Sequence, residues 1–338
     1  MEEDIIMYHV RFKNNHYQAG YNFGQKLYQK QLLLKDKINF FQTSKRKAFM
    51  QACLPIYQKF YPEILEEIKG IADGLKLTHE DLYTFLLSMY CFEVENKCTC
   101  FAFHNGKETI LARNSDFLVE LEKTNMNCLY KLNHVYAFQG NTTAFVEMED
   151  GMNEHGLAIG LTFIYPTIRK PGFNAGMIVR YLLEKCQTTK EAIQTLKQLP
   201  IASSQTLTIA DRNGEVVVVE CNPEQMVIIR PQQNESFVVT TNHFHTPELY
   251  PYNNFNIDNW KSEERYQTAY HALKTHQNYS IDLARDILSG KHGFMCQYDR
   301  KTGADTLWSV IYCCQSKTIL RIEGNPSRKK FHEDKRFY

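Results

Sequence analysis

The sequence contains no hydrophobic run long enough to cross a membrane. A membrane helix needs about 18 or more consecutive apolar residues, and the longest runs here, such as Val216–Val219, have the length of strands. The first residues, Met1–Ile6, are acidic and lack the basic region and apolar core of a secretory signal peptide. Repeats, low-complexity stretches and linkers rich in Pro, Gly and Ser are also missing. We therefore expect a cytoplasmic protein that does not act at a membrane.

Neither sign of charge is in excess, since 39 Lys and Arg stand against 38 Asp and Glu. Without a basic stripe, nucleic acid is not expected as a partner. The ten cysteines lack the dense spacing of a disulfide scaffold, so we expect buried thiols, one of which could be chemically active. A hydrophobic content of 43% is enough for a sizeable core.

The first hundred residues are predicted to be helical. Within Phe60–Leu87, apolar residues recur at steps of three and four, Pro62 suits a first helical turn, and Gly74 ends that helix. Thr78, followed by two acidic residues, is a typical N-cap and predicts a second helix that runs to about Met89.

After Asn96, short runs rich in Val, Ile, Thr and Phe predict mainly antiparallel strands. The expected strands are Thr99–Phe103, Thr109–Asn114, Ala144–Met148, Ala158–Phe163, Thr206–Ala210, Val216–Cys221, Met226–Arg230, Phe237–Thr240, Thr306–Tyr312 and Thr318–Ile322. Tight turns are expected at Asn105-Gly106, Asp150-Gly151 and Asn213-Gly214. Two helical stretches interrupt the strands, Gly176–Lys197, which divides at Thr188, and Ser262–Leu288. The pattern predicts one compact α+β domain of sheets covered by helices.

Cys98 and Cys100 lie where helix gives way to strand. A thiol held at the start of a strand can serve as a nucleophile once it loses its proton, although a lone cysteine is more often a core residue. Cys98, Cys100 and His104 could instead bind a metal, with His243 and His245 as further ligands. His104 lies at a turn, however, and no second Cys/His pair follows at finger spacing, so no metal is expected. The local signature of a papain-like cysteine is absent.

A polar cluster follows in Ala112–Phe117, which reads ARNSDF. It could be a solvated turn. Alternatively, Arg113 and Asp116 could be fixed groups that hold a carboxylate and an amine, respectively, near the thiol.

Cys98-Thr99, Phe101-Ala102 and Arg113-Asn114-x-Asp116 together resemble the nucleophile region of the N-terminal-nucleophile (Ntn) hydrolases. The pattern is most similar to the acyl-coenzyme A:6-aminopenicillanic acid acyltransferase-like (isopenicillin N acyltransferase-like) family and more distantly to choloylglycine hydrolases, with Ala112 where Gly is usual. Six further segments resemble family motifs in the family order: His16–Gly24, Pro62–Asp81, Gly151–Phe163, Thr241–Phe244, Ser262–Tyr266 and Gly324–Pro326.

The resemblance implies a four-layer αββα sandwich of two mostly antiparallel sheets covered by helices. Residues 1–97 would form a helical N-terminal segment of the same fold, and residues 98–338 the catalytic core. It also implies autoproteolysis at Lys97–Cys98, after which the free α-amine acts as the base for the Cys98 thiol. Relatives commonly carry Gly where Lys97 stands here, and Gly permits the strained backbone that scission exploits.

By the same resemblance, Arg113 would orient the substrate or tune the thiolate, and Asp116 would bind the new α-amine. Asn242 would donate to the oxyanion, together with a backbone N–H just after Phe163. Asn114 and Arg265 are expected to support the architecture of the site. For Arg265, the alternative is an exposed arginine at the start of a helix.

The expected reaction is acyl transfer from a small N-acylated substrate through a Cys98 thioester, without a cofactor. Water as acceptor would give hydrolysis of a linear amide, and an amine or an acyl-CoA would take part as co-substrate if the acyl group is transferred. The alternative is a catalytically silent protein that keeps the fold, is never processed and uses its pocket for binding.

Overall fold

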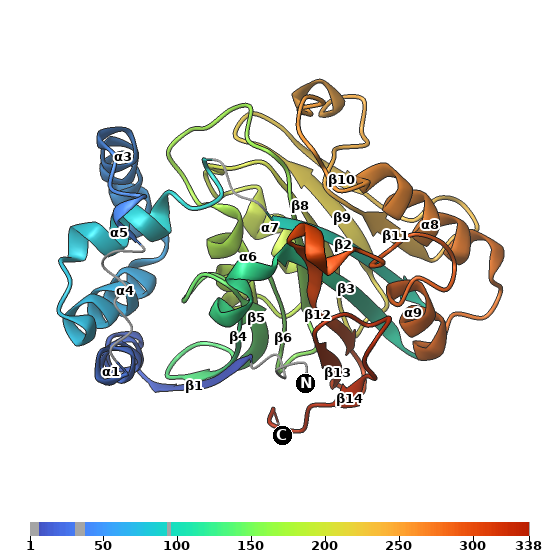
Figure 1. Ribbon diagram of the computed structural model, residues 1–338, viewed down its shortest axis with the longest axis horizontal. Coiled ribbons are helices and arrows are strands. Elements are labelled where there is room, and N and C mark those ends of the chain that lie inside the picture. Colours follow the sequence, from blue (N-terminus) through green and yellow to red (C-terminus); the bar gives the residue numbers. More distant parts are fainter. Residues whose placement is uncertain (1–6, 31–37, 93–95, 338) are drawn as a thin grey trace.

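The computed structural model describes residues 7–30, 38–92 and 96–337. Two β-sheets lie at its centre, with helices on both outer sides (Figure 1). The first sheet has eight strands in the order β1 (Tyr8–Asn14), β4 (Met126–Leu132), β5 (Phe138–Thr142), β6 (Asp150–Asn153), β7 (Ala158–Phe163), β8 (Gln205–Ala210), β9 (Val216–Cys221) and β10 (Met226–Ile229). The second has six, in the order β11 (Phe237–Thr240), β2 (Asn96–His104), β3 (Thr109–Leu118), β12 (Ala304–Cys313), β13 (Thr318–Glu323) and β14 (His332–Glu333).

The helices divide between the two outer faces. On the side of the eight-stranded sheet lie α1 (His16–Gln29), α3 (Ser44–Phe60), α4 (Pro62–Leu75), α5 (His79–Leu87), α6 (Ala175–Lys185) and α7 (Thr189–Leu196). On the side of the six-stranded sheet lie α8 (Ser262–Thr275) and α9 (Ile281–Leu288). Short 3-10 turns occur at Val119–Thr124, Tyr250–Tyr252 and Arg300–Thr302.

Three apolar clusters define the layers. One joins the outer face of the eight-stranded sheet to α1 and α3–α7, and another joins the outer face of the six-stranded sheet to α8 and α9. The third lies between the sheets, where Cys100 and Val310 of one sheet meet Met152 and Val218 of the other. The predicted α+β architecture of two sheets covered by helices is thereby confirmed.

Many of the predicted boundaries are confirmed as well. The strands Ala158–Phe163, Val216–Cys221 and Phe237–Thr240 begin and end where the sequence placed them. The side chain of Thr78 caps α5 by accepting the N–H of Asp81, and that of Thr188 caps α7 by accepting the N–H of Glu191. All ten cysteines are buried, as expected.

Other predictions are wrong. The predicted strand Ala144–Met148 is a turn, in which Phe145 has a φ of 55°. Asp150-Gly151 is not a turn but part of β6, and the chain reverses further on, where Gly156 has a φ of 80°. A side chain at Gly156 would also meet the carbonyl oxygen of Cys314 at 2.3 Å, so the turn requires glycine on both counts.

The N-terminal segment is not helical throughout. Tyr8–Asn14 form β1, which pairs in parallel with β4 at the edge of the eight-stranded sheet. The sequence did not predict this strand, because its apolar and polar residues alternate over only a few positions beside a strong helix signal. Strand β1 ties the N-terminal segment to the same sheet as the rest of the chain.

The helices of that segment pack backbone to backbone. A Cβ atom at Gly20 of α1 would lie 2.1 Å from the carbonyl oxygen of Glu67 in α4, and one at Gly74 of α4 would lie 2.5 Å from the carbonyl oxygen of Tyr21. Close approach therefore explains the glycines in both helices. Among the residues described above, no helix is both long and apolar enough to cross a membrane.

Candidate active site

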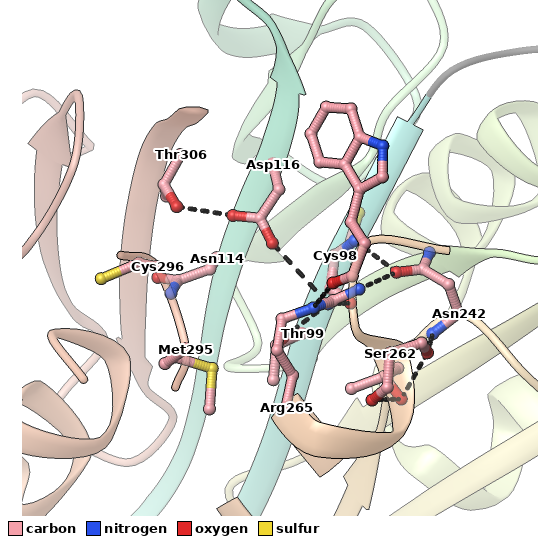
Figure 2. A network of polar contacts seen from close by, with 12 residues as sticks. Cys98, Thr99, Asn114, Asp116, Asn242, Ser262, Arg265, Met295, Cys296 and Thr306 are labelled. Atoms are coloured by element: carbon pink, nitrogen blue, oxygen red, sulfur yellow. Dashed lines mark hydrogen bonds and ion pairs between the residues drawn. The ribbon is translucent and has the colours of Figure 1, made fainter. Parts of the chain in front are cut away.

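Cys98 lies on β2 in the six-stranded sheet, with its side chain fully buried. Because side chains alternate along a strand, Cys98 and Cys100 point to the space between the sheets, and Thr99 points to the helix side. The Cys98 backbone N–H donates to Oδ1 of Asn242 at 2.8 Å, and its carbonyl oxygen accepts from Nη1 of Arg265 at 2.6 Å (Figure 2). The predicted nucleophile is thus held on both sides of its α-carbon.

Arg113 lies between the thiol and two carboxylates. Its Nη2 donates to Sγ of Cys98 at 2.8 Å and contacts Oε2 of Glu149 at 3.2 Å, and its Nη1 donates to Oδ2 of Asp150 at 2.8 Å. Its Nε donates to the carbonyl oxygen of Leu161 at 2.9 Å. The fully buried guanidinium is therefore fixed from three sides, and one donor is left to face the sulfur.

Burial controls the protonation of the Cys98 thiol. It raises the pKa of Cys98 to about 12, Arg113 lowers it in part, and Glu149 and Asp116 raise it again. With the Lys97–Cys98 peptide bond intact, the thiol is therefore protonated at neutral pH. A group close to the sulfur must therefore take up this proton when the thiol attacks.

Asn242 follows β11 and connects three parts of the site. Its backbone N–H donates to Oγ of Ser262 at 2.8 Å, and its Nδ2 donates to the carbonyl oxygen of Phe163 at 2.8 Å. Its Oδ1 accepts from Cys98 and from Nη2 of Arg265 at 2.9 Å. In the uncut chain the amide oxygen, rather than the amide N–H group, faces Cys98, so the predicted oxyanion role stays a prediction.

Arg265, at the start of α8, is fully buried rather than exposed. Besides Cys98 and Asn242, its guanidinium donates to Oγ1 of Thr99 at 2.9 Å and to the carbonyl oxygens of Asn259 and Trp260. It thus holds the backbone of the nucleophile and the side chain of Asn242 in one arrangement. The alternative of an exposed arginine is wrong, since burial and five acceptors fix this side chain.

Asp116 lies on β3 with its carboxylate on the face opposite to Arg113. It accepts from Oγ1 of Thr306 at 2.6 Å and from the hydroxyl of Tyr298 at 3.0 Å, and lies 3.6 Å from Nη1 of Arg265. Burial raises the pKa of Asp116 to about 6, although Arg265 opposes this. Its register partner on β2 is Lys97, next to the expected cleavage point. This placement leaves the expected contact with a free Cys98 amine a prediction.

Asn114 shares the face of Asp116 but is directed at a helix. Its Nδ2 donates to the carbonyl oxygen of Leu288 at the end of α9 at 2.9 Å, and its Oδ1 accepts from Oγ of Ser309 at 2.6 Å. It therefore joins three elements, β3, α9 and β12, in line with a supporting role.

The alternative metal set of Cys98, Cys100 and His104 is not assembled. Cys100 packs against Gly160, where a Cβ atom would lie 2.5 Å from its Sγ. His104 shares a hydrogen bond of 3.1 Å with Thr109. Over residues 7–30, 38–92 and 96–337, the group of side chains with metal-ligand spacing consists of His243, His245 and Glu263.

Several residues of the site escaped the sequence analysis. Glu149 and Asp150 contact Arg113, and Asp150 also accepts from Nε1 of Trp308 at 2.9 Å and from the hydroxyl of Tyr312 at 2.6 Å. The one signal for them was a pair of acids next to a strand, which was interpreted as a turn. Only the pairing of β6 with β5 and β7 shows that the pair faces a buried arginine.

A cavity of about 360 Å³ adjoins the site. Asn242 lies in its wall, together with the aromatic residues Tyr165, Tyr250 and Phe255 and the polar side chains of Asn259 and Glu263. Asn242 therefore links this cavity to the backbone of Cys98.

The family model described as acyl-coenzyme A:6-aminopenicillanic acid acyl-transferase matches residues 103–328, well over half of the 338 residues. The chain belongs to this family. The resemblance to this family found in the sequence is thus confirmed, and the family is one of acyl-transferring enzymes. The matched residues begin after Cys98.

Solved structures with detectable similarity to this acyl-transferase family member include penicillin V acylase from Agrobacterium tumefaciens. It is 18% identical, the match covers 67% of this chain and 83% of that one, and the TM-score is 0.48. Two variants of the conjugated bile acid hydrolase from Clostridium perfringens are each 12% identical over 70% of this chain and cover 96% and 97% of theirs, with TM-scores of 0.49 and 0.47. A comparison with curated proteins finds no match.

Proposed function

We propose that the protein is a cysteine-dependent amidase or acyltransferase that processes small N-acylated substrates through a thioester on Cys98. The observation that carries this proposal is the pairing of the Cys98 thiol with the buried Arg113, in a chain of the acyl-transferase family. The fixed backbone of Cys98, held by Asn242 and Arg265, supports the same assignment.

Activation would begin with the chain itself. Sγ of Cys98 attacks the carbonyl carbon of Lys97, the C–N bond breaks as the nitrogen takes up the thiol proton, and water then hydrolyses the resulting ester. The products are a carboxylate on Lys97 and a free α-amine on Cys98. That amine has an unperturbed pKa of roughly 7.7–8.0, so it can accept the thiol proton near neutral pH, which the buried thiol does not release by itself.

Catalysis would then repeat the attack on a substrate amide. The α-amine takes the proton of Cys98, Sγ bonds to the acyl carbon, and the amine of the substrate leaves with that proton. Water resolves the thioester to an acid, while an amine or thiol acceptor, including coenzyme A, would give a new acyl compound. In this scheme Asp116 orients the α-amine, Arg113 stabilises the thiolate, and Asn242 turns its amide toward the oxyanion. Ten cysteines without the dense spacing of a disulfide scaffold favour a reducing compartment such as the cytoplasm.

Intact-mass analysis and amino-terminal sequencing of freshly purified and of incubated protein test the activation step. We expect two chains, one of which begins at Cys98. Cys98→Ala should remain a single folded chain, and Cys100→Ala, the matched control two residues along the same strand face, should still be cut.

Acyl-enzyme trapping on a panel of N-acylated amines and amino acids tests the chemistry. A thioester should form on Cys98 and be absent from Cys98→Ala, and products formed with and without an added amine separate transfer from hydrolysis. A wild-type chain that stays uncut, forms no thioester and yet binds such amides would contradict the proposal and support the silent binding protein.

A further inference from the structure

His243, His245 and Glu263 form a cluster that the proposed function does not use. The two histidines follow β11, and Glu263 lies in the first turn of α8. One ligand atom from each side chain lies within 4.8 Å of the others, and the two rings are 4.1 Å apart between their centres. We propose that these three side chains bind a divalent transition metal ion, with zinc as the preferred ion.

The ring nitrogens of the two histidines point to a missing ligand. Nε2 of His243 and Nε2 of His245 are both buried. Among the described residues, Nε2 of His245 has no hydrogen-bond partner, and Nε2 of His243 lies 2.8 Å from an oxygen of Glu263. Buried polar atoms are normally paired, and an ion is one of the few partners that would satisfy both nitrogens and the carboxylate at once.

Neighbouring residues fix the orientation of both imidazole rings, as is usual for histidines that bind a metal. Nδ1 of His243 is 2.7 Å from Oγ of Ser262, and the ring of His245 lies against Tyr266 with 3.8 Å between ring centres. The backbone N–H of His245 donates to Oε1 of Glu220 at 2.7 Å. A hydrogen bond on the second ring nitrogen fixes the orientation of a ligating imidazole.

The charges around the cluster also suit a metal. Glu263 contributes the charge that offsets the ion, and its side chain is 63% exposed, which gives the ion a route from solvent. The nearest opposing charge is Arg265, whose donors are already taken by other groups.

Two imidazoles and one carboxylate are a known zinc set, whereas calcium and magnesium prefer oxygen ligands alone. Ligand atoms on a tetrahedral zinc ion lie roughly 3.4 Å apart, which the exposed Glu263 can reach by a change of rotamer. Three protein ligands leave a fourth position. Because His243 and Glu263 also line the 360 Å³ cavity, that position is open to a carboxylate or carbonyl group bound there.

Zinc binding by the full-length protein, freed of metal with a chelator, tests this inference. The probe is zinc alone, measured in competition with a chromophoric chelator, and Co²⁺ reports coordination through its visible absorption. Cys98→Ala is the background of choice, because it removes the active thiol as a competing ligand and keeps the chain uncut. The outcome therefore does not depend on the proposed acyl chemistry.

We expect one equivalent of zinc and a tetrahedral Co²⁺ spectrum. Glu263→Gln, which changes an exposed side chain, and His245→Ala should each weaken zinc binding about tenfold or more. His292→Ala is the matched control, because His276 and His292 also form a ring pair, 5.1 Å apart, to which the described part of the chain adds no third ligand. Zinc binding that is unchanged in Glu263→Gln and His245→Ala, or lost equally in His292→Ala, would overturn the proposal.

Discussion

Arg113 and Arg180 are both fully buried, and the two arginines serve different ends. Arg180 of α6 donates to Oε2 of Glu67 at 2.8 Å and to Oε1 of Glu184 at 2.7 Å, and its guanidinium lies 3.7 Å from the centre of the Tyr130 ring. Glu184 in turn accepts from Tyr61 and His16. Every described partner of Arg180 is a carboxylate, a carbonyl or a ring.

Arg113 differs in one contact. It also binds two carboxylates, but its remaining donor faces the sulfur of Cys98. The Arg180 network joins α1 and α4 of the N-terminal segment to α6, whereas the Arg113 network joins the two sheets around a thiol. A buried arginine with two acids is therefore no sign of a reactive centre, and the nucleophilic partner is what separates the two cases.

The largest effect is expected on stability. Arg180→Met should lower the free energy of unfolding by about 3–5 kcal/mol, because Glu67 and Glu184 would lose their buried counter-charge. Arg113→Met should cost a similar amount through Glu149 and Asp150. Chemical denaturation of the uncut Cys98→Ala background measures both. If neither substitution lowers the free energy of unfolding by more than an ordinary surface substitution does, neither network stabilises the fold.

Turnover should separate the two arginines. Arg113→Met is expected to slow acyl transfer by about 10²–10³-fold, since it removes the guanidinium that donates to the sulfur. Arg180→Met, measured per folded molecule and below its unfolding temperature, should keep the wild-type rate. Equal losses in the two variants would mean that Arg113 acts through structure alone.

Two buried carboxylates, Glu184 beside Arg180 and Asp116 beside Arg265, should respond to pH with opposite signs. Against the effect of burial, Arg180 and His16 lower the pKa of Glu184 from 4.5 to about 2. Through this shift Glu184 contributes about 3 kcal/mol to the free energy of unfolding. This contribution is present above pH 4.5 and is lost as the pH falls toward 2. Burial raises the pKa of Asp116 from 3.8 to about 6, so that group favours the folded state at low pH and loses this advantage as the pH rises to 6.

Stability curves of Glu184→Gln and Asp116→Asn between pH 2.5 and 7 test this contrast. Relative to wild type, Glu184→Gln should lose less stability as the pH falls below 4.5. Asp116→Asn should not show the decline in stability that wild type shows as the pH rises from about 4 to 6. Parallel curves for wild type and both variants would refute the opposite shifts.

The smallest effect is expected at the asparagines. Asn242→Ala should still form a thioester but slow its turnover about 10²-fold, through loss of one oxyanion donor. Asn114→Ala is the matched control, because its amide reaches the end of α9 rather than Cys98, so it should lower stability and leave the rate per folded molecule unchanged. An unchanged rate in Asn242→Ala on an accepted substrate would remove its oxyanion role.

Much of the fold could be predicted from local patterns. Caps such as Thr78 and Thr188 and the Val-rich run of β9 act through near neighbours in the chain, so they are visible in the sequence. Strands β1, β4, β5, β6 and β14 were missed because their pairing partners, and not their own residues, make them strands.

The candidate site shows the same division. Cys98, Arg113, Asp116, Asn242 and Arg265 were singled out through a resemblance, and the structure brings them around one stretch of β2. Figure 2 shows Cys98, Asp116, Asn242 and Arg265 in this arrangement. Glu149 and Asp150 could not be identified, because the contact that matters spans two sheets. The exposure of Arg265 could not be judged either, because its acceptors come from distant segments of the chain.

The parallel ladder between β1 and β4 has a consequence for how the protein assembles. Its seven residue pairs, from Tyr8 with Met126 to Asn14 with Leu132, join a strand before Lys97 to a strand after Cys98. Once the chain is cut as proposed, that ladder becomes an interface between two polypeptides. Unfolding would then also be dissociation, with a midpoint that falls on dilution. The uncut precursor folds as one molecule, whereas the denatured mature protein would have to refold by the encounter of two.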